Sequence, residues 1–419
     1  MRPYFTRERF GGFRLFAGLL LLVFLGQAVW LVHAEFSATD SPDGPEAERI
    51  SEGWKQWHGR GVAGAPYFDP AGGLSLAGVH RFASQDSPGG ATDFDDEHSP
   101  LLALVSAAPL LAWPHDLDSD SARHWRWLPR LPFLICGLFL GASLWYVARR
   151  LCGNTGGLIA LTFYCFSPSF LQASAVWHTE PEIVAAWGAF GAIFTAIAVA
   201  HTLYAPREVV LWNWRRIVLL GVSLAIAVGA QFSMIVVVPV AVGFLLYVAP
   251  VRRGAGMVIG GSACAVGLVA LFAAYFFHPQ AFAESMRHAV FWGATWRGFA
   301  VWGVYKQVAA QIARACPALA LGLPVAVVTY AAWPRTRYFG NTAPLLVALL
   351  FTGLGMAHPH SGGAGFLLAA IPFLFIFVAG VLVDLMETRF RALVTAGIIG
   401  MMAAYAAWSL ANLMQVPRG

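Results

Sequence analysis

The chain has 419 residues, of which 58% are hydrophobic and only 12% are charged. A water-soluble domain carries about twice that charged fraction, so the composition excludes a soluble globule and predicts a polytopic membrane protein. The formal net charge of +5 does not indicate a nucleic-acid partner, because the arginines are dispersed between apolar runs and form no basic face.

The cysteines have no paired or metal-ligand spacing, and each lies within or beside an apolar run. We therefore interpret them as small hydrophobic residues and expect no disulfide framework. They are Cys136, Cys152, Cys165, Cys264 and Cys316.

Apolar runs predict an all-α fold with about eleven transmembrane helices. Residues 1–14 form a basic cytoplasmic leader, and the run at 15–32 is long enough to cross the hydrocarbon layer. The length of this run and the lack of an obvious small-x-small cleavage site favour a first transmembrane helix over a signal peptide. Helices 2–7 are expected within 131–277 and helices 8–11 within 314–419. The runs lie at 131–148, 156–173, 181–203, 216–231, 233–250, 256–277, 314–333, 343–357, 364–384 and 392–413.

The arginines orient these helices, because short cytoplasmic loops carry an excess of Arg and Lys. With a cytoplasmic N-terminus, the segments 33–130 and 278–313 face outward, and the break near Gln231 must be a tight hairpin. Residue usage rich in Arg, Ala, Gly and Trp and poor in Lys indicates a bacterial inner membrane. The inner clusters are then Arg149-Arg150, Arg207 with Arg215-Arg216, Arg252-Arg253, Arg335 with Arg337, and Arg389 with Arg391.

The extracytoplasmic loop at 33–130 is too long to be a mere connector. Ile50, Trp54 and Trp57 recur at helical spacing, which predicts an amphipathic helix on the membrane surface. Asp43 is followed three residues later by Glu46, as in a capping box. A structural cap and a catalytic carboxylate are compatible interpretations, since the capped start of a helix is a rigid place to hold an acid.

An acidic cluster, Asp93 to His98, places four carboxylates and a histidine directly before an apolar helix that starts at Pro100. Its structural interpretation is a solvated turn, because acids before a first-turn proline suit the positive end of the helix dipole. Its functional interpretation is one wall of an active site at the edge of the bilayer.

Four short elements along the chain carry a family resemblance. In their order and at their intervals they resemble the C-superfold (GT-C) membrane glycosyltransferases, in particular the protein O-mannosyltransferase-like and aminoarabinose-transferase-like group. The match covers about residues 40–250, and Gln231-Phe232-Ser233 and His358-Pro359 resemble later spans of that group. The four elements are His98-Ser99-Pro100-Leu101, Arg130-Leu131-Pro132, Ala148-Arg149-Arg150-Leu151-Cys152-Gly153 and Ser167-Pro168.

The resemblance implies transfer of a sugar from a polyprenyl-phosphate donor to a lipid, glycan or protein acceptor on the extracytoplasmic face, with inversion. A carboxylate would accept the proton of the attacking hydroxyl, and basic groups would stabilise the departing phosphate. The catalytic candidates are Asp43, Glu46 and Glu97. The substrate-binding candidates are Asp95, Asp96, His98, Glu180, Arg287, Arg297 and Lys306.

Several candidates have a structural alternative. Glu180, at the mouth of a span, is also typical of a helix cap, and basic residues among the tryptophans of 278–313 are also typical interface anchors. No cofactor is required by this chemistry. If a divalent cation takes part, the candidate ligands are His278, His358 and His360.

The main departure from the family pattern lies in the outer loop. Aligning the surface helix puts Glu46 on the family's Glu and Pro45 where its catalytic Asp stands, so Asp43 supplies the base only if the loop is shifted by two residues. The alternative function is therefore a catalytically inactive GT-C-like structural subunit of a larger membrane complex. A transporter is disfavoured, because the sequence has no evident internal repeat and few ionisable residues at mid-bilayer depth.

Overall fold

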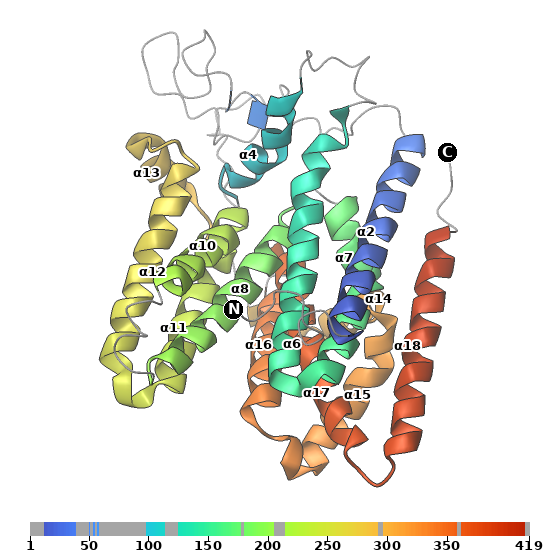
Figure 1. The fold of residues 1–419 in the computed structure, drawn as a ribbon. Coiled ribbons are helices and arrows are strands. Elements are labelled where there is room, and N and C mark those ends of the chain that lie inside the picture. The colour runs from blue at the N-terminus through green and yellow to red at the C-terminus, as the bar shows by residue number, and fades with distance from the viewer. Residues whose placement is uncertain are drawn as a thin grey trace, which may run out of the picture. The chain divides into compact units, whose positions relative to one another are not determined.

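A computed structural model describes most of the chain, including most of the apolar runs. Its described part is built from α-helices and short 3-10 helices, and no strand occurs among those residues (Figure 1). The chain divides into two compact units. Unit 1 comprises residues 1–39, 134–177 and 294–419, and unit 2 comprises 40–133 and 178–293. The described residues are 12–38, 50, 53–54, 57, 98–113, 125–176, 180–204, 214–291, 296–357 and 362–414.

Close glycine contacts hold the apolar helices of unit 2 together. A Cβ added at Gly188 would lie 2.5 Å from the backbone nitrogen of Ala227, and one added at Gly191 would lie 2.9 Å from the Ser223 hydroxyl. Small residues allow this approach, which matters because lipid is as apolar as the side chains and gives no hydrophobic drive to associate. The pairing shows that α8 and α10 are antiparallel. The helices are α8 (Glu182–Thr202), α10 (Trp214–Ala230), α11 (Val237–Val248) and α12 (Arg253–Ala273).

The break at Gln231 reverses the chain, as the sequence predicts. Gly221 of α10 abuts Ala263 of α12, and eight residues later Gly229 abuts Leu271, so these two helices run in the same direction. The intervening α11 must therefore run back between them. Gln231 itself is extended, with φ −153° and ψ 119°, which ends α10 and allows the turn.

A small layer of short helices packs on one end of unit 2. The indole N–H of Trp57 donates to the carbonyl of Leu104 at 3.0 Å, and Ile50 is 4% exposed against Leu110 and Trp125. The described residues between 50 and 57 are helical, as predicted, but their apolar side chains pack on protein. The layer consists of α4 (Leu101–Ala107), η1 (Ala108–Ala112), η2 (Leu128–Arg130) and the helical residues around Trp54.

In unit 1, helix α6 is two helices joined by a reversal at Gly153, where φ is 77°. This left-handed conformation favours glycine. The two parts are antiparallel, since the Tyr164 hydroxyl donates to the Gly137 carbonyl at 2.6 Å. The reversal confirms the predicted break between 148 and 156. The second part ends at Cys165, short of the predicted residue 173, because the chain turns again before Pro168 and continues as α7 (Pro168–Ala175).

The remaining helices of unit 1 pack around α17, whose apolar stretch is 94% buried. A helix that is apolar on every face suits such a central position. These helices are α2 (Gly12–Ala38), α6 (Leu131–Cys165, in unit 1 from Leu134), η5 (Trp296–Ala300), α14 (Trp302–Ala315), α15 (Pro317–Ala332), η6 (Pro334–Thr336), α16 (Phe339–Ala357), α17 (Gly362–Met386) and α18 (Arg391–Met414).

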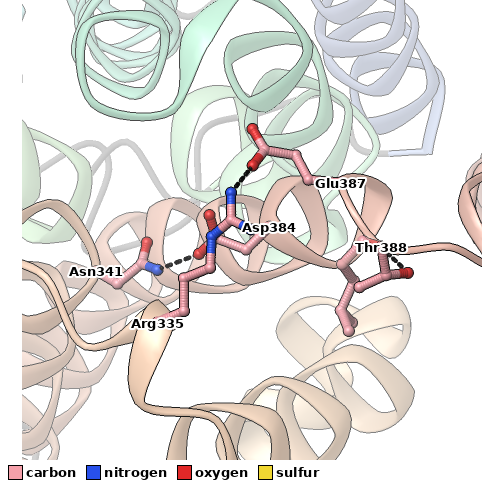
Figure 2. Close-up of polar contacts among 6 residues, drawn as sticks. Arg335, Asn341, Asp384, Glu387 and Thr388 are labelled. Atoms are coloured by element: carbon pink, nitrogen blue, oxygen red, sulfur yellow. Dashed lines mark hydrogen bonds and ion pairs between the residues drawn. The ribbon is translucent and has the colours of Figure 1, made fainter.

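Polar contacts tie α16 and η6 to the end of α17 (Figure 2). The Asn341 amide donates to the Asp384 carboxylate at 2.9 Å, and the Arg335 guanidinium contacts the Glu387 carboxylate. Burial, and then the neighbouring Cys152 and Asp384, raise the pKa of the Tyr338 phenol above its usual range. That phenol therefore stays protonated and able to donate.

The protein is an all-α integral membrane protein. Among the described residues, seven helices are long and apolar enough to cross a membrane, or eight if α14 and α15, bent by 114°, count as one span. Each predicted apolar run falls on helical structure, but the number eleven stays a prediction. The cysteines all lie in the described part and are unbridged, as expected.

Candidate functional site

Most of the acidic candidates lie outside the described residues, namely Asp43, Glu46, Asp95, Asp96 and Glu97. Two histidine candidates, His358 and His360, and the side chain of Arg297 also lie outside them. Their roles stay predictions. The described candidates are His98, Glu180, His278, Arg287 and Lys306.

The helix directions in unit 2 bring the described candidates of that unit to one end. Because α8 is antiparallel to α10 and α10 is parallel to α12, the start of α8 and the ends of α10 and α12 share this end. It carries His98, Glu180, His278 and Arg287, which the sequence assigns to outward-facing segments. We call this the outer end of unit 2.

Ser99 anchors the segment that leads from the acidic cluster into α4. Its hydroxyl donates to the Gly229 carbonyl at 2.6 Å and its backbone N–H donates to the same carbonyl at 3.3 Å. Carbonyls in the last turn of a helix lack intrahelical partners, so Ser99 satisfies one at the end of α10. A proline at this position would have neither donor. Ser99 therefore fixes the start of this segment to the end of α10.

Of the two acids at the start of α8, the structure buries Glu182 and exposes Glu180. Glu182 is 8% exposed in the first turn of the helix, whereas Glu180 precedes Pro181 and is exposed. A carboxylate in a first turn is stabilised by the helix dipole. Sequence reasoning selected Glu180, and the signal for Glu182 was its position as the first residue after the proline.

The basic residue predicted on α13 (Pro279–His288) is solvent-exposed. The Arg287 side chain, 74% exposed, lies 3.6 Å from the Glu284 carboxylate three residues earlier. Such exposed pairs are worth about 0–1 kcal/mol, so this contact leaves the guanidinium able to exchange partners. His278 precedes the helix and its Nδ1 lies 3.1 Å from the Tyr275 carbonyl.

In unit 1, Lys306 lies on the exposed face of α14. The opposite face carries Val308, which packs with Met356 and Leu367. Trp302, 70% exposed, stacks on the ring of Tyr305 beside the lysine. This exposed aromatic and basic face fits both interpretations of the segment, an interface anchor and a phosphate contact.

Two arginines that sequence reasoning did not select are buried at the outer end of unit 2. Arg126 is 3% exposed and Arg130 is fully buried, and both have interaction partners within the protein. A buried guanidinium costs several kcal/mol unless it is partnered. The sequence signal for Arg130 was the motif Arg130-Leu131-Pro132, which supported only the resemblance to the C-superfold glycosyltransferases.

A divalent cation would need ligands from several side chains. In the part of the chain that the structure describes, no group of three or more His, Cys, Asp or Glu side chains could hold a metal ion. His278 is the described member of the predicted histidine set, so the described residues offer it no companion ligands.

No family model and no curated protein matches this chain. Solved structures do match. The oligosaccharyltransferase of Archaeoglobus fulgidus in complex with zinc and sulfate has a TM-score of 0.56 at 12% identity, over 94% of this chain and 53% of its own. The archaeal oligosaccharyltransferase AglB from the same organism, in complex with an inhibitory peptide and a dolichol-phosphate, has a TM-score of 0.55 at 13% identity, over 96% and 55%.

The fold is the C superfold of membrane glycosyltransferases. A third similar structure, the Archaeoglobus fulgidus enzyme tethered with an acceptor peptide through a disulfide bond, has a TM-score of 0.51 at 12% identity. This chain spans about half the length of the C-superfold proteins it matches. The resemblance to the superfold is confirmed at the level of the fold.

Proposed function

We propose that this chain is a membrane glycosyltransferase that transfers a sugar from a polyprenyl-phosphate donor to an acceptor on the extracytoplasmic face, with inversion. The observation that carries the proposal is the C-superfold architecture over 94–96% of the chain. The matched proteins bound to dolichol-phosphate and to an acceptor peptide support a lipid-linked donor and a peptide or glycan acceptor. The narrower group, O-mannosyltransferase-like or aminoarabinose-transferase-like, rests on the four sequence elements alone.

The proposed active site lies at the outer end of unit 2. The acceptor oxygen attacks the anomeric carbon, the bond from that carbon to the phosphate oxygen breaks, and the polyprenyl phosphate leaves with the electron pair. Asp43 or Glu46 takes the proton of the acceptor. A single displacement from the face opposite the phosphate inverts the anomeric carbon. The remaining acids of the cluster and His98 orient the sugar and the acceptor.

The departing phosphate regains negative charge and needs basic groups nearby. We assign this role to Arg287 of unit 2, whereas the roles of Arg297 and Lys306, which belong to unit 1, stay predictions from the sequence. Arg287 is suited to it because its exposed contact with Glu284 is weak and readily exchanged. Glu180 contacts the acceptor in this proposal, and the buried Glu182 supports it from the start of α8. No step requires a metal ion.

We also propose an orientation. A cytoplasmic N-terminus in a bacterial inner membrane follows from the arginine-rich loops, and the outer end of unit 2 then faces the periplasm. The proposal is supported by the shared position of the described candidates at that end.

The test is transfer of a labelled sugar by the purified full-length protein in lipid bilayers, with a panel of polyprenyl-phosphate hexoses and pentoses. Loss of a general base costs about 10²–10⁴ in rate, so Asp43→Asn or Glu46→Gln should reduce turnover at least about a hundredfold. Glu387→Gln, a like change at an exposed carboxylate of unit 1, should leave turnover unchanged. If the wild type consumes no donor, the chain is instead an inactive structural subunit. If the wild type is active and neither variant affects turnover, the assignment of Asp43 or Glu46 as the base is wrong.

A further inference from the structure

Unit 1 contains a basic cavity whose lining residues are not among the candidates for sugar transfer. It has a volume of about 390 Å³ and is lined by Arg14, Tyr146, Arg149 and Arg150. Volumes of this size are at the lower end of small-molecule sites, which run from about 300 to 1,000 Å³. Three guanidinium groups around one cavity predict an anionic ligand.

Helix packing explains why residues so distant in sequence meet here. A Cβ added at Gly137 would lie 3.4 Å from the Phe24 ring, and one added at Gly141 would lie 3.0 Å from Leu21. Helix α2 therefore runs antiparallel to the first part of α6. Continuing this register brings Arg14 level with the residues that precede the reversal at Gly153. The cavity is thus built by the fold and is not an accident of one flexible side chain.

Aromatic rings hold two of the arginines in place. The Arg149 guanidinium lies 5.3 Å from the Trp145 ring, and that of Arg150 lies 5.5 Å from the Tyr146 ring. Both distances lie within the range of cation–π contacts, which restrain the two guanidinium groups beside the cavity. Each guanidinium has five N–H donors, so both groups keep donors for a planar, bidentate contact with an oxyanion.

A third donor comes from Tyr146. Arg150 donates to the Tyr146 hydroxyl at 3.4 Å, so the phenol accepts there and can donate its own proton to a ligand. The described carboxylates at this end of unit 1 are engaged elsewhere, Asp384 with Asn341 and Glu387 with Arg335. The cavity therefore keeps a positive field that these carboxylates do not cancel.

We propose that the cavity formed by Arg14, Tyr146, Arg149 and Arg150 is a phosphate-binding site. The shared chemistry is a phosphate monoester or diester, held by guanidinium edges and a phenol. Its source is either the headgroup of an anionic phospholipid or a free phosphate. The exposed apolar side chains beside Arg14, namely Phe13, Leu15 and Phe16, favour the lipid. This inference does not depend on the proposed sugar transfer.

The experiment measures binding to the purified full-length protein in a neutral detergent by microscale thermophoresis. The probes are dihexanoyl phosphatidylglycerol, dihexanoyl phosphatidylcholine and inorganic phosphate. The test variant is Arg149→Gln with Arg150→Gln. The matched control is Arg252→Gln with Arg253→Gln, which removes the same charge from the exposed start of α12 in unit 2.

The expected result is that the test variant weakens binding of phosphatidylglycerol at least tenfold, whereas the control changes it less than twofold. Binding of phosphatidylglycerol but not inorganic phosphate identifies a lipid headgroup, and binding of both identifies a site for free phosphate. Equal weakening by both pairs, or no binding of either anionic probe, overturns the proposal.

Two further variants keep the test decisive if the double variant does not fold. Arg149→Lys with Arg150→Lys retains the charge but loses the planar fork, so binding should weaken severalfold. Arg14→Gln alone removes a lining group from the other helix and should also weaken it. If these variants fold and bind like the wild type, the cavity is a solvated basic edge and the proposal fails.

Discussion

Two regions of the molecule contain similar residue types in different environments. They are the outer end of unit 2 and the region of unit 1 around Arg335 and Glu387. In unit 2, Arg130 is fully buried and Glu182 is 8% exposed. In unit 1, the Arg335 and Glu387 side chains are 61% and 56% exposed. The outer end of unit 2 therefore contains buried charges beside exposed ones such as Arg287, whereas the ion pair of unit 1 is exposed.

The difference has an energetic meaning. Removing a charge from water costs several kcal/mol, so a buried charge persists only where fixed partners compensate it. Such groups are preorganised, which is what electrostatic catalysis requires. Exposed charges can move and exchange partners at little cost, which suits the recruitment of a mobile ligand.

Arg130→Met should cause the largest loss of stability. Removing a buried charge costs about 3–5 kcal/mol, because the groups that it contacted stay buried without compensation. Unfolding in mixed detergent micelles measures the loss. Arg150→Met, at an exposed position of α6, should change the free energy of unfolding by less than about 1 kcal/mol. Equal losses in the two variants would contradict the contrast.

Glu182→Gln and Glu180→Gln should separate a buried carboxylate from an exposed one. We expect Glu182→Gln to lower kcat/KM for transfer at least about tenfold, since preorganised groups in a dry site act strongly on the transition state. Glu180→Gln should mainly raise the KM for the acceptor, by a few fold, because a solvated contact contributes uniform binding. Steady-state kinetics measures both. A larger effect at Glu180 would mean that burial does not mark the functional acid.

Ser99→Ala should destabilise the protein by about 1 kcal/mol, the usual worth of one hydrogen bond. Ser99→Pro removes the N–H donor as well and should cost about 2 kcal/mol by the same reasoning. Ser262→Ala is the control, since the Ser262 hydroxyl bonds within its own exposed helix turn, and its effect should stay near zero. Thermal unfolding in detergent measures all three, and equal midpoints for Ser99→Ala and Ser262→Ala would remove the anchoring role of Ser99.

The contact between Arg335 and Glu387 should have the smallest effect. A double-mutant cycle with alanine at both positions should give a coupling below about 1 kcal/mol, because the pair is exposed. Added salt should reduce the coupling further. A coupling of several kcal/mol would show that this end is as preorganised as the outer end of unit 2.

The sequence was sufficient for the positions of most helices and for their reversals. Runs of about twenty apolar residues need a membrane, and the arginine-rich loops predict the reversals near Gly153 and Gln231. A glycine at positive φ ends one helix, and the extended Gln231 ends another. The resemblance in the four short elements also led to the correct superfold.

The candidate site could be predicted only in part. The sequence predicted that His98, Glu180, His278 and Arg287 lie on the extracytoplasmic side of the membrane. The helix directions of unit 2 bring them to one end of that unit. It did not single out Glu182, Arg126 or Arg130. Two acids separated by one residue look alike in sequence, and which one is buried depends on how α8 packs on its neighbours.

By itself the sequence determined that this is an all-α membrane protein and where most of its helices lie, because the hydropathy and length of each apolar run are local properties. The tertiary structure decided which helices face protein and which do not. Helices α8 and α12 have nearly equal mean hydropathy, 2.1 and 2.0, yet 72% and 33% of their apolar stretches are buried. Lipid and protein interior are equally apolar, so composition cannot separate the two, and the buried share of a helix depends on how many neighbouring helices cover it.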